Sequence, residues 1–378
     1  TTGGQVLALA HNGNMSNGIM FPVETNPATG EPLSGDYAER RARWEPLYEV
    51  TQIKGDGETH PLLSPDDAFA DYETLALGNL NLTVPKEDGM LRYEYARQAL
   101  KDGLKMEAEL GTNPYKFGMV GSSDTHTALA AIEEDNYIGK HAGTEPSPER
   151  WNHPMAKFEG RQYEGYAMAS SGYAAVWATD NTRKALFDAM KRKEVYATTG
   201  PRMLVRFWGG WDFVEADANS RLPAAVGYAK GVPMGGDLAA APSGKSPTFL
   251  VAALKDPYGA NLDRIQIVKG WVDKAGKTHE KVYDVAWGDA ESRKPGSDGK
   301  LPAVGNTVDV ANATWTNTIG DPELITVWTD PDFDAGQQAF YYTRVIEIPT
   351  PRWTAYDAKR FNVELSKEVA MTTQERAY

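Results

Sequence analysis

The stretch Phe117-Gly118-Met119-Val120-Gly121-Ser122-Ser123-Asp124-Thr125-His126 indicates the fold class of this 378-residue chain. Its first four residues form a short apolar run typical of a buried strand, and the polar residues after Val120 indicate a loop at the carboxyl end of that strand. A second apolar run, Val6 to Ala10, is followed in the same way by His11. Short strands that end in polar loops and alternate with helices predict a parallel α/β layer, either a barrel or a doubly wound sheet.

The pattern changes near residue 200 and predicts two domains. Before that point, the spacing of Ala96, Leu100 and Leu104 predicts a helix that ends at Gly111, and a second helix is expected over 182–193. After it, short apolar runs bounded by Gly, Pro or Asp favour a β-sandwich. These predicted strands are Met203–Trp208, Thr248–Ala253, Ile265–Val268, Lys281–Trp287, Leu324–Trp328 and Ala339–Ile348. We therefore expect an α/β domain over residues 1–202 and a β-rich domain over residues 203–378.

Composition excludes several classes of function. The chain has 39 Lys and Arg residues and 52 Asp and Glu residues, a net charge of −13, which argues against binding to nucleic acid or to an anionic membrane. It has no cysteine, so thiol nucleophiles, cysteine zinc sites and iron–sulfur clusters are excluded. Any metal would be held by His, Asp and Glu. The apolar runs are too short to span a bilayer.

Asp124 and His126 are the first candidate metal ligands. In an extended backbone, residues two positions apart point to the same side, so these two side chains could bind one cation or two adjacent cations. A carboxylate and an imidazole suit zinc, manganese or iron better than calcium. The alternative is a helix-capping Asp beside a surface His, and the short motif alone does not decide between them.

His11 and Glu49 are further candidate ligands. His11 also follows a predicted strand, and parallel α/β folds place their active sites at the carboxyl ends of strands. Glu49 lies in a third predicted strand, 47–54, which we expect to be a neighbour in the same sheet. The alternatives are a loop imidazole bonded to the backbone for His11, and an ion pair with an arginine of segment 40–43 for Glu49.

Other polar residues are candidates for proton transfer and for substrate binding. Glu58 and His60 lie on a loop flanked by glycine, so they could act as catalytic groups in proton transfer. Basic residues near the same edge could neutralise an anionic substrate; they are Lys54, Arg97, Lys140 and Arg202. For Arg202, an ordinary salt bridge at a domain junction is the alternative. The chain has no Gly-x-Ser-x-Gly elbow, dinucleotide fingerprint or P-loop, and Ser122 is interpreted as a turn residue.

Several motifs resemble a known superfamily. His11 after a strand, Glu49-Val50 in a later strand and the segment 121–126 resemble the later metal motifs of the PHP (polymerase and histidinol phosphatase) superfamily. Longer stretches resemble an uncharacterised bacterial family within it, known as domain of unknown function 3604. These stretches are His11–Asn14, Gln52–Gly55, Tyr196–Arg202, Pro233–Gly236 and Ile348–Trp353.

This resemblance implies a distorted β/α barrel that binds two or three divalent transition-metal ions and acts as a phosphoesterase. His11, Asp124 and His126 match ligand positions, and Glu49 is a further match. The chain lacks the His-x-His strand with which members of the superfamily begin, so it resembles their middle and C-terminal portion, an incomplete barrel. The resemblance therefore also implies a missing N-terminal segment or fragment as a partner, and a periplasmic or secreted location.

The sequence thus leads to one main hypothesis and two alternatives. The main hypothesis is a metal-dependent hydrolase of small anionic substrates, chiefly phosphate esters, that uses metal-activated water. A metal-dependent hydrolase could equally attack another ester, a lactone, an amide or a sulfate. The third possibility is an exported binding or assembly protein in which a degenerate barrel is a scaffold without catalytic activity.

Overall fold

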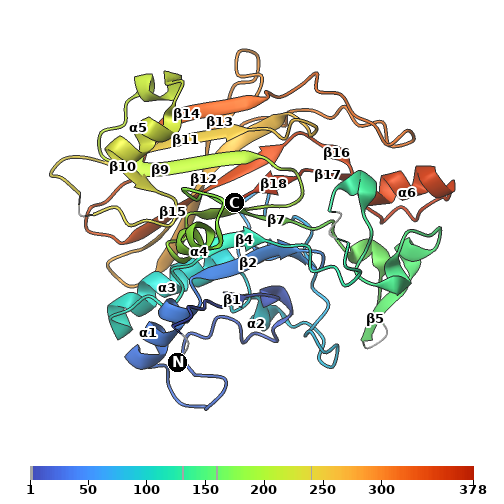
Figure 1. Ribbon diagram of the computed structural model, residues 1–378, viewed down its shortest axis with the longest axis horizontal. Coiled ribbons are helices and arrows are strands. Elements are labelled where there is room, and N and C mark those ends of the chain that lie inside the picture. Colours follow the sequence, from blue (N-terminus) through green and yellow to red (C-terminus); the bar gives the residue numbers. More distant parts are fainter. Residues whose placement is uncertain (1–2, 130–131, 159–160, 240) are drawn as a thin grey trace.

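The computed structural model describes residues 3–129, 132–158, 161–239 and 241–378, arranged in three layers (Figure 1). An α/β layer lies at the bottom of the view, a six-stranded sheet lies in the middle, and a four-stranded sheet lies at the top. The candidate site is at one edge of the α/β layer.

The α/β layer contains an open sheet of four short strands. β1 (Leu9–Ala10) and β4 (Gly118–Gly121) both run parallel to the central strand β2 (Leu47–Gln52). β3 (Gly55–Asp56) turns back antiparallel to β2. β2 and β4 are largely buried between helices and the middle sheet, as their apolar sequences predict, whereas Leu9 of the short strand β1 is exposed. Among the described residues this sheet is open and does not close into a barrel. That it is part of an incomplete barrel stays a prediction.

Helix α3 (Ala96–Leu110) covers the inner face of this layer. Its buried residues include Ala96, Ala99 and Met106, which pack in a core cluster with β2, β4 and the middle sheet. The helix ends at Gly111, whose φ of 79° is the left-handed conformation that glycine tolerates. The other helices are α1 (Gly35–Trp44), α2 (Asp88–Leu91), α4 (Arg183–Lys191), α5 (Pro223–Lys230) and α6 (Trp353–Phe361). No helix in the described part of the chain has the length and apolar character needed to cross a membrane.

The middle sheet joins the two halves of the chain. Its strand order is β13-β12-β15-β18-β8-β7, and β7 and β8 come from before residue 202. The strands are β7 (Tyr173–Val176), β8 (Val195–Thr198), β12 (Leu262–Val272), β13 (Thr278–Trp287), β15 (Ala339–Glu347) and β18 (Arg376–Ala377). Because this sheet contains strands from both predicted domains, the halves share one continuous layer. The boundary at residue 202 stays a prediction.

The outer sheet packs on the middle sheet. It consists of β10 (Gly231–Pro233), β9 (Leu204–Gly210), β11 (Thr248–Leu254) and β14 (Glu323–Thr329), all antiparallel. Apolar residues such as Val251 of β11 and Ile267 of β12 meet in a common core between the two sheets. Because successive side chains of a strand point to opposite faces of the sheet, the other face of each sheet is available for other contacts. Four short strands form two separate antiparallel pairs; they are β5 (Pro154–Phe158) with β6 (Arg161–Glu164), and β16 (Thr350–Pro351) with β17 (Thr372–Thr373).

Candidate functional site

Polar segments from three strands meet at one edge of the α/β layer. Because β1, β2 and β4 are parallel neighbours, their carboxyl ends lie side by side. At the end of β2, Gln52 Nε2 donates a hydrogen bond of 2.6 Å to Asn12 Oδ1, which follows β1. On the other side of β2, the hydroxyl of Ser122 after β4 donates to Glu49 Oε1. The structure thus brings together the segments that contain the predicted ligands.

Asp124 binds two lysines at this edge. Its carboxylate accepts a hydrogen bond from Lys140 Nζ at 2.6 Å and forms an ion pair with Lys54 Nζ. Lys140 Nζ also donates to the backbone oxygen of Asp124 at 2.6 Å. Asp124 has a φ of 48°, in the left-handed region that Asp tolerates better than most residues, and its Oδ2 and its backbone oxygen both face the lysines.

The two ammonium groups are partly removed from water and influence each other. The pKa of Lys54 is lowered to about 7, first by burial and then by the positive charge of Lys140, whereas Glu49 raises it. Burial also lowers the pKa of Lys140. At neutral pH the charged and neutral forms of Lys54 are therefore both populated, because its surroundings disfavour a second ammonium ion beside Lys140. We call Glu49, Lys54, Ser122, Asp124 and Lys140 the rim cluster.

Glu49 has one carboxylate oxygen with no partner. Its Oε1 accepts from Ser122, but its Oε2 is buried and has no hydrogen-bond partner within the described residues. An unpaired buried carboxylate oxygen is costly unless a cation or a donor reaches it. This atom is the observation in the site that most directly fits a metal ion.

The two predicted histidine ligands lie on exposed loops. His126 Nδ1 is 3.0 Å from the backbone oxygen of Asp124 and 3.9 Å from its carboxylate. His11 Nδ1 is 3.2 Å from the backbone oxygen of Leu9. Since a carbonyl oxygen only accepts, both contacts place the proton on Nδ1 and leave Nε2 as the acceptor nitrogen, the tautomer of many metal-binding histidines.

The geometry brings some of the predicted ligands together. Asp124 and His126 share one turn, and Glu49 is linked to that turn through Ser122, whereas the described contacts of His11 stay within its own loop. In the described parts of the chain, no three His, Asp or Glu side chains converge as a ready metal site. The donors that are present, carboxylate oxygen and imidazole nitrogen, fit a divalent transition metal by chemical type.

Glu58 and Arg97 lie in a buried ion network away from the rim cluster. Arg97 donates from Nε to Glu58 Oε1 at 3.0 Å and from Nη2 to Asp67 at 2.7 Å, and Arg344 of β15 binds both carboxylates as well. Arg97 is 0% exposed and Glu58 2% exposed. A substrate cannot reach side chains enclosed in this way, so we leave Glu58 out of proton transfer and Arg97 out of substrate binding.

His60 and Arg202 have local partners. His60 Nδ1 accepts a hydrogen bond of 3.2 Å from the backbone of Leu62, and burial lowers the pKa of its imidazole. Arg202 lies on the ring of Tyr173 at 5.3 Å, with Glu133 at 3.8 Å, and its side chain is 70% exposed. These contacts match the ordinary salt bridge weighed for Arg202, and no described contact links either residue to the rim cluster.

Ser122 has a larger role than its sequence indicated. It was interpreted as a turn residue, but its hydroxyl holds Glu49 in place. The signal that could have identified it is its position directly after a strand parallel to that of Glu49, where short polar side chains face the neighbouring strand.

Comparison with known proteins gives one result. A family model described as "Protein of unknown function (DUF3604)" matches residues 1–378. No curated protein and no solved structure matches the chain.

Proposed function

Because the chain belongs to the DUF3604 family, whose description assigns no activity, we propose its function from its own geometry. We propose a hydrolase that depends on a divalent metal ion and acts on anionic esters, chiefly phosphate esters. The observation that carries the proposal is the buried Oε2 of Glu49, which has no hydrogen-bond partner among the described residues and lies in a cluster that also holds Asp124 and two lysines.

Glu49, Asp124 and His126 would hold the metal ion, with His11 as a further ligand from the neighbouring loop. Their oxygen and nitrogen donors suit zinc, manganese or iron. When bound, such an ion supplies an acidified water molecule and stabilises negative charge on the ester group. Ser122 orients Glu49 through its hydrogen bond, so that Oε2 is the oxygen directed away from the protein donors.

Lys54 and Lys140 define the class of substrate. Lys140, and Lys54 when it is protonated, place positive charge at the carboxyl edge of the sheet, and their side chains are only 12% and 8% exposed. Partly buried ammonium groups attract anions more strongly than exposed ones, because water screens them less. A phosphate ester would compete with Asp124 for these groups and would be oriented by them.

The PHP resemblance belongs to this proposal. We infer that the α/β layer is the later part of a PHP-like barrel, and that an N-terminal segment of the same protein would supply further ligands for two or three ions. Its support is the free edge of β1, which pairs with β2 alone among the described strands. A periplasmic or secreted location stays a prediction of the resemblance.

Metal analysis combined with substitution tests the proposed function. Protein would be incubated with Mn²⁺ or Zn²⁺, dialysed, analysed for metal by mass spectrometry and assayed with p-nitrophenyl phosphate and its diester. Asp124→Ala and Glu49→Gln should lose most of the bound metal and at least about tenfold of the activity, since each removes a ligand oxygen.

Asp180→Ala, which changes an exposed carboxylate outside the site, is the matched control and should keep both properties. If Asp124→Ala retains the metal content of the parent protein, the proposed metal site is wrong. Parent protein that takes up no metal would instead favour the role of a binding or assembly protein.

A further inference from the structure

Two histidines that the proposed function does not use lie next to each other. His141 directly precedes the short helix η3 (Ala142–Thr144), and His153 directly follows the short helix η4 (Arg150–Asn152). A Cβ placed on Gly143 would be 3.1 Å from His153 Nε2 and 3.5 Å from His141 Nδ1. One ring nitrogen of each histidine is therefore close to the same point, which the glycine leaves open.

The imidazoles of His141 and His153 have no hydrogen-bond partner within the described residues. Each of the other four histidines of the chain makes a polar contact through a ring nitrogen; the partners are Leu9, Leu62, Asp124 and Asp273. A ring nitrogen without a protein partner is available to a ligand. The two histidines that lie together are thus the two whose nitrogens are available.

Hydrogen bonds hold the backbone at both histidines. Thr144 is 3% exposed; its backbone N–H donates to the oxygen of His141 at 2.8 Å, and its hydroxyl accepts from the N–H of His141 at 3.2 Å. The backbone oxygen of His153 accepts from the N–H of Gly165 at 2.9 Å. Because the backbones are already fixed, little further order is lost when a ligand binds between the two side chains.

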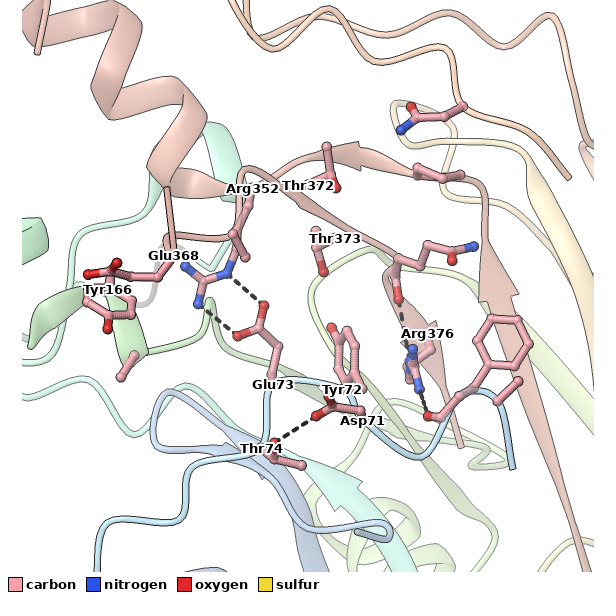
Figure 2. A pocket seen from close by; sticks show the side chains of 17 residues that line it. Asp71, Tyr72, Glu73, Thr74, Tyr166, Arg352, Glu368, Thr372, Thr373 and Arg376 are labelled. Carbon is pink, nitrogen blue, oxygen red and sulfur yellow. Dashed lines mark hydrogen bonds and ion pairs between the residues drawn. The ribbon is translucent and has the colours of Figure 1, made fainter. Parts of the chain in front are cut away.

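Two buried arginines anchor this region to the rest of the molecule. Arg150 of η4 binds both carboxylate oxygens of Asp357 in α6. Arg352 donates from Nη2 to the backbone oxygen of Met168 at 2.7 Å, and the same guanidinium binds both oxygens of Glu73 at 2.7 Å each (Figure 2). The fold itself therefore sets the position of η4 and of the histidine that follows it.

We propose that His141 Nδ1 and His153 Nε2 together bind one divalent transition-metal ion of the zinc and copper class. Imidazole nitrogen suits zinc, copper and nickel, whereas manganese, magnesium and calcium prefer oxygen ligands. A zinc–nitrogen bond is about 2.0–2.1 Å long, and the exposed side chain of His141 can rotate to bring its nitrogen to that distance. In the described parts of the chain no third His, Asp or Glu side chain joins the pair, so water would complete the coordination.

The bound ion would link η3 to η4. His141 directly follows Lys140, whose Nζ donates to the carboxylate of Asp124 at 2.6 Å. The ion would therefore also fix the stretch of chain that presents Lys140 to the rim cluster. The proposed hydrolase site contains neither histidine, so this proposal does not depend on it.

Metal binding would be measured by calorimetry with Zn²⁺ and with Mn²⁺, on protein without a histidine tag. His141→Ala and His153→Ala should each weaken one Zn²⁺-binding event by at least about tenfold, because a single imidazole remains. Binding of Mn²⁺ should not change in either variant, because this ion prefers oxygen ligands. The control is His279→Ala, which removes a histidine paired with Asp273 and should bind Zn²⁺ as the parent protein does.

Two results would overturn the proposal: no Zn²⁺ binding to the parent protein, or equal Zn²⁺ binding in the parent protein and both variants. Asp124→Ala separates this site from the rim cluster, because it should keep the Zn²⁺-binding event that depends on His141. If Asp124→Ala abolishes that same event, the two histidines do not form a site of their own. Loss of a different binding event in Asp124→Ala would concern the proposed hydrolase alone.

Gly143 offers a test that leaves both histidines in place. The methyl group of Gly143→Ala would stand 3.1 Å from His153 Nε2, in the space that the ion and its water would occupy. This variant should weaken Zn²⁺ binding by about tenfold or more, whereas Gly89→Ala, whose Cβ has no atom within 4 Å, should leave it unchanged. An unchanged Zn²⁺ affinity in folded Gly143→Ala would contradict this position of the ion.

Discussion

Asp56 is a buried carboxylate that the fold does not fully satisfy. It is 2% exposed, its Oδ1 accepts a hydrogen bond of 2.8 Å from the backbone of Glu58, and its Oδ2 has no partner in the described structure. Burial raises the pKa of Asp56 to about 7, against the lowering effect of that hydrogen bond. The folded protein therefore holds this group protonated at pH values where the unfolded chain would release the proton.

This predicts an unusual pH dependence for Asp56→Asn. Below pH 3.8 both states are protonated; between 3.8 and about 7 only the unfolded state ionises, so the parent protein loses stability as the pH rises. The amide of the variant does not ionise. The free energy of unfolding of the variant, relative to that of the parent protein, should therefore increase by up to about 4 kcal/mol between pH 4 and pH 8. Urea unfolding at both pH values measures this gain.

Asp66→Asn is the control, because Asp66 is an exposed carboxylate ten residues further along the chain. It should show the same stability relative to the parent protein at both pH values. An Asp56→Asn difference that is independent of pH, or that decreases as the pH rises, would contradict the assignment of a raised pKa.

Single residues show where sequence reasoning ends. The pairing of Asp124 with His126 follows from their spacing along one segment. The contact of Asp124 with Lys54 does not, because it depends on the register of β2 against β4 and on the left-handed backbone of Asp124. Glu58 was predicted to transfer protons and Arg97 to bind substrate, but the structure buries both in an ion network with Arg344, which is distant in sequence and so gives no local signal.

At the scale of elements, the end of β4 lies very close to β7 and β8. A Cβ on Gly172 would be 2.2 Å from the backbone oxygen of Thr198 and 2.9 Å from Thr51 Cγ2. A Cβ on Gly121 would lie 2.8 Å from the backbone oxygens of Thr198 and Tyr173. The absence of side chains at these glycines lets β4 and the start of β7 approach each other, and so positions Ser122 beside Glu49.

Gly172→Ala should therefore destabilise the protein by several kcal/mol, because the added methyl group meets backbone atoms that cannot move independently. Gly89→Ala is the matched control: no atom lies within 4 Å of its added Cβ, and it is in helix α2, so it should be neutral or stabilising by up to about 1 kcal/mol. Thermal unfolding of both variants tests this prediction. Equal melting temperatures of the two variants would contradict the close approach of β4 and the start of β7.

Elements were the best predicted level of structure. The apolar runs of the β-rich half correspond to β9, β11, β12, β13, β14 and β15, with ends that differ by a few residues. Strands of two or three residues, such as β18 and β10, were missed because they are too short to show periodicity. The predicted elements also left out helix α5, whose first residue is Pro223, a favoured start for a helix.

At the scale of the whole molecule, a buried ion network connects the layers. Arg97 of α3 binds Glu58 and Asp67, and also Glu280 of β13 at 3.0 Å, while Arg344 of β15 binds Glu58 at 3.0 Å. The same carboxylates thus serve arginines from the α/β layer and from the middle sheet. Shared partners of this kind couple the two halves of the chain, since neither half satisfies its buried charges alone.

Arg97→Met should lower the stability of the whole molecule by about 3–5 kcal/mol, because it leaves Glu58 and Asp67 short of a buried partner. Calorimetry should show one unfolding transition at a lower temperature. The control Lys105→Met changes a half-exposed lysine on the same helix and should shift the transition little. Two separate transitions in the Arg97 variant, with only one of them shifted, would show that the halves unfold independently.

Strand β18 also has a consequence for biosynthesis. It fills the place between β15 and β8 in the middle sheet, where the Thr199 hydroxyl donates to the backbone oxygen of Arg376, 177 residues further along the chain. On the ribosome, β8 would leave the exit tunnel long before its sheet neighbour has been translated. The nascent chain must therefore keep an open sheet edge at β8 until β18 is translated, which makes it a natural client of chaperones that shield such edges.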